Sequence, residues 1–262
     1  MTRIGEKFDR LKRAGEKALI PFFFAGDPDM ATTYGLVLEA EKSGADLIEL
    51  GIPYSDPLAD GPVNQAASAR ALKNGVRLGG VFSLVRDLRQ KTRIPILFLL
   101  YFNCVMQYGI ERFLSDCAIS GVDGLVIPDL PYEERTNYAD VFGRYPVDII
   151  PLVTPASRER AANITRGAGG FVYCVTSSGV TGMRDRFETD FAAFMKEVGG
   201  VTKLPKVLGF GISTPAQAKE LKNHAEGVIV GSAAVRLIER CAPEALMREF
   251  SRFIREFKEA LR

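Results

Sequence analysis

A short internal repeat narrows the choice of fold more than any other feature of this sequence. Residues 43–53 (SGADLIELGIP) are echoed by residues 120–131 (SGVDGLVIPDLP). Each copy reads as a helix end, a glycine, an aspartate, an apolar strand and a loop that contains proline and, together with the residues just after it, aspartate. This order is typical of a repeated strand–helix unit, and such units build a parallel sheet.

Apolar runs of strand length recur along the whole chain and alternate with segments of helical periodicity. Strands are predicted over residues 19–25, 46–51, 95–101, 121–127, 147–153, 171–176, 206–210 and 227–230. The predicted helices include residues 107–120, 132–143 and 157–166, the last with Ser157 as its cap. About eight such pairs predict an α/β fold, a single (β/α)8 TIM barrel over residues 1–262. A lead-in helix at residues 3–13 and a short extra helix after the last strand complete it.

Composition excludes several classes of function. The net charge of +2 gives no reason to expect a nucleic-acid or membrane partner. The longest apolar run, residues 94–102, is far shorter than the roughly 18 residues of a membrane span. Four scattered cysteines without a CxxC pair, and one histidine, predict no metal site, no disulfide framework and a cytoplasmic location.

Acidic side chains mark the second predicted strand and the loop after it. Glu49 lies between apolar residues inside this strand, and a buried carboxylate is costly unless a ligand or a hydrogen bond needs it. The loop carries Asp56 and Asp60 among prolines, which restrict the backbone and hold it stiff. The alternative is an ordinary paired glutamate followed by ordinary turn aspartates.

In a (β/α)8 barrel the active site lies at the carboxyl ends of the strands. Glu49, Asp56 and Asp60 qualify by this rule, as do Asp27 and Asp129. His224 precedes the last strand and therefore belongs to the opposite face, where a structural role is expected.

Glycines follow the last two strands, where barrels of this class usually bind phosphate. Gly211 follows the seventh strand, Gly231 and Ser232 follow the eighth, and Gly182 after the sixth adds a further N–H donor. Bare glycine lets backbone N–H groups approach a phosphate, and a helix N-terminus favours its charge. The alternative is that these glycines only make tight turns.

Apolar residues at or near the strand ends are candidates for a pocket that holds a flat apolar group. They are Phe22, Leu100, Ile127, Tyr173 and Phe210. Each of them is equally compatible with the barrel core.

Five motifs together resemble the alpha subunit of tryptophan synthase. They are IELGIPYSDPLADGP from Ile48, IPDLPYEE from Ile127, SSGVTG from Ser177, GFGIS from Gly209 and VGSA from Val230. The resemblance implies a lyase that cleaves indole-3-glycerol phosphate into indole and glyceraldehyde 3-phosphate, in the last steps of tryptophan biosynthesis. It implies that Glu49 is the general acid–base and that Asp60 binds the indole N–H.

The resemblance also implies how substrate and partner are held. Gly182, Gly211, Gly231 and Ser232 would bind the phosphate, and residues 177–186 resemble a lid that brings Thr181 near the acids. The partner would be a beta subunit that carries pyridoxal phosphate (PLP), in an alpha2beta2 heterotetramer, while this chain has no cofactor of its own. The contacting residues would be Tyr54, Asp56, Pro57 and Asn103. Asn64 and Cys104 depart from the family's usual residues.

Alternatives stay open at this point. A stand-alone lyase that releases free indole has nearly the same sequence requirements. Another phosphate-binding barrel, such as a sugar-phosphate isomerase or decarboxylase, fits the glycine loops. A catalytically inactive activator of a partner enzyme is disfavoured, because both Glu49 and Asp60 are present.

Overall fold

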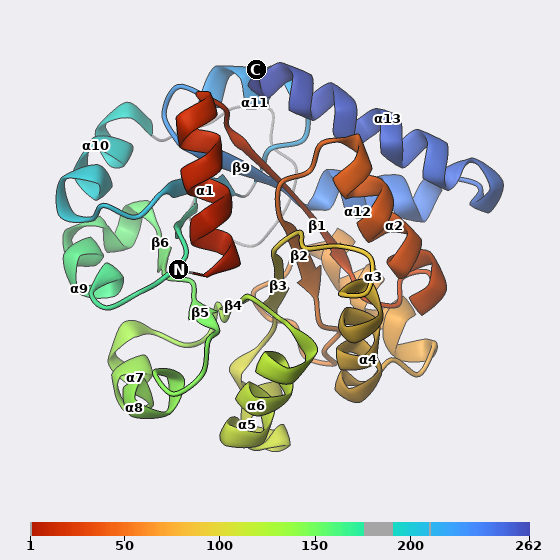
Figure 1. The fold of residues 1–262 in the computed structure, drawn as a ribbon, viewed down its shortest axis with the longest axis horizontal. Helices are drawn as coiled ribbons and strands as arrows, with labels where there is room; N and C mark the ends of the chain where they lie inside the picture. Colours follow the sequence, from red (N-terminus) through yellow and green to blue (C-terminus); the bar gives the residue numbers. More distant parts are fainter. Residues whose placement is uncertain (1, 176–190, 210) are drawn as a thin grey trace.

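The strands of the computed structural model, which describes residues 2–175, 191–209 and 211–262, form a parallel nine-stranded sheet. Its order is β5-β4-β3-β2-β1-β9-β8-β7-β6, so chain neighbours pair almost throughout (Figure 1). The strands are β1 Ala18–Phe24, β2 Ile48–Gly51, β3 Ile96–Leu99, β4 Gly124–Val126, β5 Asp148–Ile149, β6 Leu152–Val153, β7 Val172–Val175, β8 Lys206–Gly209 and β9 Gly227–Val230.

The two outermost strands in this order, β5 and β6, are two parts of one extended segment. Only Ile150 and Pro151 separate them. Proline has no N–H to donate to a sheet ladder, which explains the interruption. Because β5 pairs with β4 and β6 pairs with β7, the split segment closes the sheet. The predicted TIM-barrel fold is therefore confirmed, with its fifth strand divided at a proline.

Helices follow the strands and surround them (Figure 1). They are α1 Arg3–Ala14, α2 Met30–Ser43, α3 Pro62–Lys73, α4 Leu78–Leu88, α5 Phe102–Tyr108, α6 Ile110–Ser120, α7 Tyr132–Thr136, α8 Ala139–Phe142, η1 Pro155–Arg160, α9 Ala161–Thr165, α10 Phe191–Val201, α11 Pro215–Leu221, α12 Ser232–Arg240 and α13 Pro243–Leu261. No helix of the described ranges is long and apolar enough to cross a membrane.

Three predicted helices are broken in the structure. The helix predicted at 107–120 begins earlier and is divided at Gly109, whose φ of +89° lies in the left-handed region that glycine tolerates. The helix predicted at 132–143 consists of the short α7 and α8. The helix predicted at 157–166 starts as the 3-10 turn η1, and Thr154 rather than Ser157 is its N-cap.

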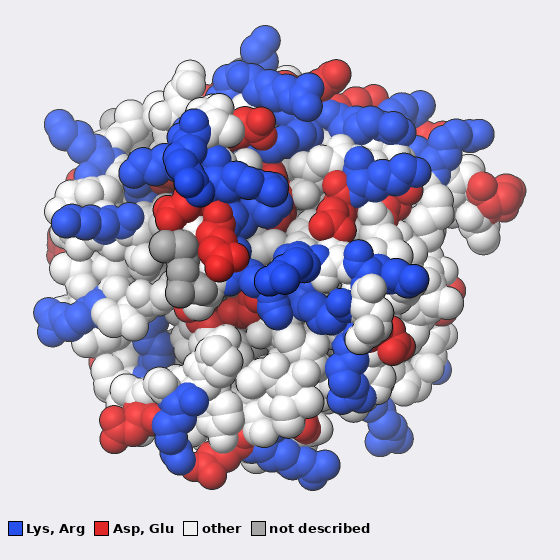
Figure 2. All heavy atoms as spheres, in the orientation of Figure 1, with Lys and Arg blue, Asp and Glu red and all other residues white. Residues whose placement is uncertain are grey.

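The lead-in helix α1 covers the amino-terminal end of the barrel. Its Phe8 ring lies 5.7 Å from the ring of Phe171, and Arg3 pairs with Asp123 at the start of β4. On this face lysines and arginines lie among aspartates and glutamates (Figure 2). With this end covered, the carboxyl ends of the strands are left for a site.

Candidate active site

Glu49 occupies the centre of β2 inside the barrel. Its neighbours across the sheet are Phe22 on β1 and Leu97 on β3. Only 2% of its surface is exposed, and neither carboxylate oxygen has a hydrogen-bond partner among the described residues. Burial, followed by the charge of nearby Asp60, raises the pKa of Glu49 to about 8. At neutral pH the side chain is therefore a carboxylic acid with a proton to give.

Asp60 lies at the end of the loop after β2 and is also buried. Unlike Glu49 it accepts hydrogen bonds. The Tyr101 hydroxyl donates to Asp60 Oδ2 and Asn64 Nδ2 donates to Asp60 Oδ1, both at 3.1 Å. Burial raises the pKa of Asp60, whereas the hydrogen bonds from Asn64 and then Tyr101 lower it. The two carboxyl groups thus lie in different surroundings, and the one with donors is the better anion.

Tyr173 on β7 completes the wall around the two acids. A Cβ atom at Gly209 on β8 would lie 2.3 Å from the Tyr173 ring, so the absence of a side chain there makes room for that ring. Burial raises the pKa of Tyr173 well above its usual value, and the charges of Glu49 and Asp60 raise it further. Tyr173 therefore remains a neutral phenol beside the acid pair.

Phe22 links the acids to the glycines after β9. A Cβ atom added to Gly51 would lie 2.9 Å from the Phe22 ring, and one added to Gly231 would lie 3.2 Å from the same ring. The two glycines thus leave space for this ring, which is itself buried. Leu100 and Ile127 are buried as well, so all four described members of the predicted pocket are buried, while Phe210 lies outside the described residues.

Two of the four predicted phosphate residues lie at the start of a helix. Gly231 is the N-cap of α12 and Ser232 is its first residue, so free N–H groups face this end of the barrel. Gly211 has a φ of +79°, in the left-handed region. Gly182 and Thr181 lie outside the described residues.

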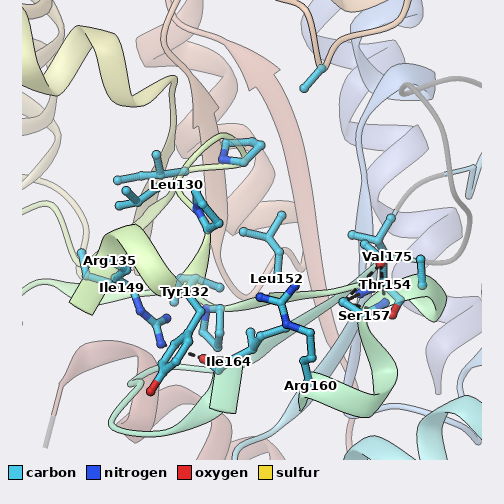
Figure 3. A pocket seen from close by; sticks show the side chains of 17 residues that line it. Leu130, Tyr132, Arg135, Ile149, Leu152, Thr154, Ser157, Arg160, Ile164 and Val175 are labelled. Carbon is cyan, nitrogen blue, oxygen red and sulfur yellow. Dashed lines mark hydrogen bonds between the residues drawn. The ribbon is translucent and has the colours of Figure 1, made fainter. Parts of the chain in front are cut away.

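A cavity of about 570 Å³ is lined by Ala59, the neighbour of Asp60 in the chain, but by neither acid (Figure 3). Residues of α7, the β5–β6 segment and η1 line it, together with Ala59, Ile127 and Val175. Its lining residues are mostly apolar, with Arg135 and Arg160 as its cations. Of the four pocket residues that the structure describes, Ile127 lines it, whereas Phe22, Leu100 and Tyr173 do not.

The residues predicted to contact a partner lie together outside the barrel mouth. The Tyr54 ring stacks on Tyr101 at 5.1 Å, and Asn103 donates to the Tyr54 hydroxyl at 2.9 Å. Asp56 is exposed and Pro57 is half-buried. Tyr101 thus contacts both the residues predicted to bind a partner and, through its hydroxyl, Asp60.

The other acids singled out in the sequence have structural partners. The Asp27 carboxylate is bound by Arg70 in two hydrogen bonds of 2.8 Å. Asp129 is exposed and accepts from the backbone N–H of Phe102 at 2.8 Å. His224 precedes β9, at the end of the barrel away from the acids, as predicted.

Sequence reasoning missed both donors to Asp60. Asn64 follows Asp60 by four residues at the start of a predicted helix, a spacing that can bring two side chains together. Tyr101 ends the third predicted strand, so the rule that selected Glu49 and Asp60 also selects it. These signals were present in the sequence but point to many residues besides these two.

Fold and site together define a class: a (β/α)8 barrel with two buried, closely placed carboxyl groups and a glycine-capped helix at its carboxyl end. Comparison with known proteins is more specific. The family model described as "Tryptophan synthase alpha chain" matches residues 8–262. The chain therefore belongs to the tryptophan synthase alpha chain family, as its motifs suggested.

Individual relatives are similar to this chain over nearly the whole length of both proteins. The tryptophan synthase alpha chain of Caldanaerobacter subterraneus is 51% identical over 265 residues, which covers 100% of both chains. The crystal structure of tryptophan synthase subunit alpha from Legionella pneumophila has a TM-score of 0.90 at 33% identity, covering 100% of this chain and 98% of that one. A chain of Mycobacterium tuberculosis tryptophan synthase also gives 0.90, at 32% identity, with 100% and 98% covered.

Proposed function

We propose that this chain is the lyase subunit that cleaves indole-3-glycerol phosphate to indole and glyceraldehyde 3-phosphate, in the last steps of tryptophan biosynthesis. The observation that carries the proposal is the acid pair. Glu49 is buried without a hydrogen-bond partner among the described residues, and Asp60 beside it accepts two hydrogen bonds. Family membership supplies the substrate, and the pair supplies the proton transfers that its cleavage needs.

The reaction is a retro-aldol cleavage of the bond between indole C3 and the glycerol side chain. Glu49, protonated because its pKa lies at about 8, gives its proton to C3. The positive charge that develops on the ring nitrogen is stabilised by the Asp60 carboxylate. The Glu49 carboxylate then removes the proton of the hydroxyl next to the breaking bond. A C=O bond forms, the electrons of the broken bond return to the ring, and indole leaves.

In this proposal the rest of the site holds the substrate. Gly211, Gly231 and Ser232, with Gly182, bind the phosphate through backbone N–H groups and the N-terminus of α12. Phe22, Leu100, Ile127 and Tyr173, with Phe210, enclose the indole ring, and Thr181 lies near the acids in the closed site. The buried, apolar character of the described members supports this assignment.

We further propose that residues 1–262 act as one domain in the cytoplasm, paired with a PLP-dependent beta subunit in an alpha2beta2 complex. The interface comprises Tyr54, Asp56, Pro57 and Asn103, and PLP belongs to the partner. Support comes from the direct contacts between this patch and the acid site: Tyr101 stacks on Tyr54 and donates to Asp60. A partner that moves Tyr54 would also move a hydrogen-bond donor of Asp60.

The test is indole release from indole-3-glycerol phosphate by the purified chain, with and without a beta subunit. We expect slow release alone and strong acceleration by the partner. Glu49→Gln should lower kcat at least about 10²-fold, since a general acid–base contributes this much, and Asp60→Asn should lower it similarly. Asp140→Asn, at an exposed carboxyl on α8, is the control. Fast release without a partner would identify a stand-alone lyase, and no release under either condition would refute the proposal.

A further inference from the structure

Asn64 is a polar side chain in a place where an apolar one would be less costly. It lies on the first turn of α3 and is only 3% exposed. Its Oδ1 atom has no hydrogen-bond partner among the described residues. An unsatisfied buried amide oxygen disfavours folding, so its presence calls for a compensating role.

The other end of the same amide is bonded. Nδ2 donates to Asp60 Oδ1 at 3.1 Å, and an ionised carboxylate can only accept, which fixes which amide atom faces it. Tyr101 serves the second carboxylate oxygen, and its hydroxyl oxygen accepts from the Ala59 N–H at 2.9 Å. The salt bridges of the described residues include none to Asp60, so two neutral donors are what the described chain offers its charge.

We propose that Asn64 is a positioning residue for the lyase reaction: its amide N–H holds the Asp60 carboxylate in one orientation and favours its ionised form over its protonated form. This inference rests on the proposed function for its catalytic consequence, but not for the hydrogen bond itself. Two carboxyl groups in one buried site compete for a single proton, and the one with more donors releases it. Asn64 thereby decides which of the two is the acid.

The titratable groups around Asp60 make this division sensitive to a single donor. Glu49 faces it from β2, Tyr101 from the end of β3 and Tyr173 from β7. Burial raises the pKa of Asp60, and the Asn64 hydrogen bond acts against it. When Asn64 is replaced by an apolar residue, Asp60 should hold its proton to higher pH.

The experiment compares the pH dependence of kcat in the wild-type chain and in Asn64→Leu, a substitution of similar volume without a donor. The ascending limb should move up by about one pH unit, since a hydrogen bond to a charged group is worth roughly tenfold in this equilibrium. The descending limb, which Glu49 sets, should stay in place, so the profile narrows from its acid side. Gln65→Leu is the matched control, because Gln65 donates at 2.8 Å to the backbone oxygen of Asp60 and not to its carboxylate.

A second readout does not depend on turnover. The ¹³C carboxyl signal of Asp60, assigned with Asp60→Asn, should titrate about one pH unit higher in Asn64→Leu than in the wild type. Asn64→Met repeats both measurements with a more flexible side chain should the leucine variant not fold. An unchanged ascending limb of the pH profile together with an unchanged Asp60 carboxyl titration would overturn the inference. If the wild type released no indole, the proposed function would fail, while the NMR titration would still decide the role of Asn64.

Discussion

At the scale of single residues, two carboxyl groups of the same site acquire different chemistry from their neighbours. Glu49 has no described hydrogen-bond partner and its pKa rises to about 8. Asp60 is buried too, but Asn64 and Tyr101 donate to it. Burial raises the pKa of both, and the hydrogen bonds from Asn64 and Tyr101 oppose this rise for Asp60 alone. A pair with unlike proton affinities is what an acid and an electrostatic stabiliser at neutral pH require.

The first prediction concerns stability and pH. Because the pKa of Glu49 rises from 4.5 to about 8 on folding, the folded chain retains a proton that the unfolded chain has lost. Its contribution is favourable at low pH and is lost as pH rises from about 5 to about 8, by roughly 3 to 5 kcal/mol. Glu49→Gln cannot titrate, so its free energy of unfolding should fall less over this range. Urea unfolding at pH 5.5, 7 and 8.5 measures the difference, and parallel curves for the two proteins would contradict it.

Glu49 and Asp60 could be selected from sequence because their context is local: a charge inside an apolar strand and an aspartate in a proline-rich loop. Their hydrogen bonds could not. Tyr101 comes 41 residues after Asp60 and reaches it only because β2 and β3 are neighbours. The charge state of the pair depends on such contacts, and therefore on the folded structure.

At the scale of elements, an arginine joins three of them. Arg70 on α3 binds Asp27 in the loop after β1, and its Nη1 lies 2.6 Å from Glu239 on α12. Helix α3 begins directly after Asp60, and α12 begins at Ser232 of the proposed phosphate site. The three-residue cluster therefore fixes the two helices that carry opposite ends of the site.

The second prediction follows from the different burial of the two acids in this cluster. Arg70→Met leaves the buried Asp27 charge without its partner, and should lower the free energy of unfolding by about 3 kcal/mol. Glu239 is 39% exposed, so Glu239→Gln should cost less than about 1 kcal/mol. Chemical denaturation of both variants is the measurement. A loss in Arg70→Met no larger than that in Glu239→Gln would show that the cluster does not hold the elements together.

The third prediction concerns the contact of β7 with β8. Gly209→Ala should displace the Tyr173 ring, since the new Cβ atom would lie 2.6 Å from its hydroxyl oxygen. Overpacking of this kind costs about 1 to 3 kcal/mol, and the ring would shift toward the acid pair. Gly199→Ala on α10 is the control, because the nearest described atom to its new Cβ, on the Lys206 side chain, would be 3.8 Å away. We expect a raised KM only in Gly209→Ala; equal KM values in the two variants would argue against the tight fit.

The elements themselves could be predicted from sequence where apolar runs and turn residues agree, as in β2 and β3. The breaks could not. Residues 147–153 read as a single strand that is apolar except for Asp148, yet Pro151 divides them because proline lacks the N–H donor that the sheet needs. Gly109 divides α5 from α6 through a left-handed backbone, whereas glycines at 79 and 80 lie within α4. The same residue type interrupts one helix and continues another, so a glycine in the sequence does not by itself locate a break.

At the scale of the whole molecule, the two ends of the barrel have different tasks. Helix α1 covers the amino-terminal end. The carboxyl end holds the acids and, just outside them, the predicted partner residues Tyr54 and Asn103, joined by a hydrogen bond. Between these and Asp60 lies Leu58, a large apolar side chain that is 86% exposed. An exposed leucine on the loop that ends in a proposed catalytic acid is a natural contact for a partner.

The last prediction is that Leu58→Asp uncouples the chain from a beta subunit without changing the acid site. Stimulation of indole release at a fixed, subsaturating beta-subunit concentration should fall about tenfold, because a charge replaces an apolar contact worth about 1.4 kcal/mol. Partner-free release should stay at the wild-type rate, since Leu58 points into solvent. Ile119→Asp is the matched control: Ile119 is 70% exposed near the end of α6, the helix that leads into the amino-terminal end of β4. Equal stimulation of the two variants would place the interface elsewhere, whereas a loss confined to Leu58→Asp would make the loop after β2 the mechanical link between partner and catalysis.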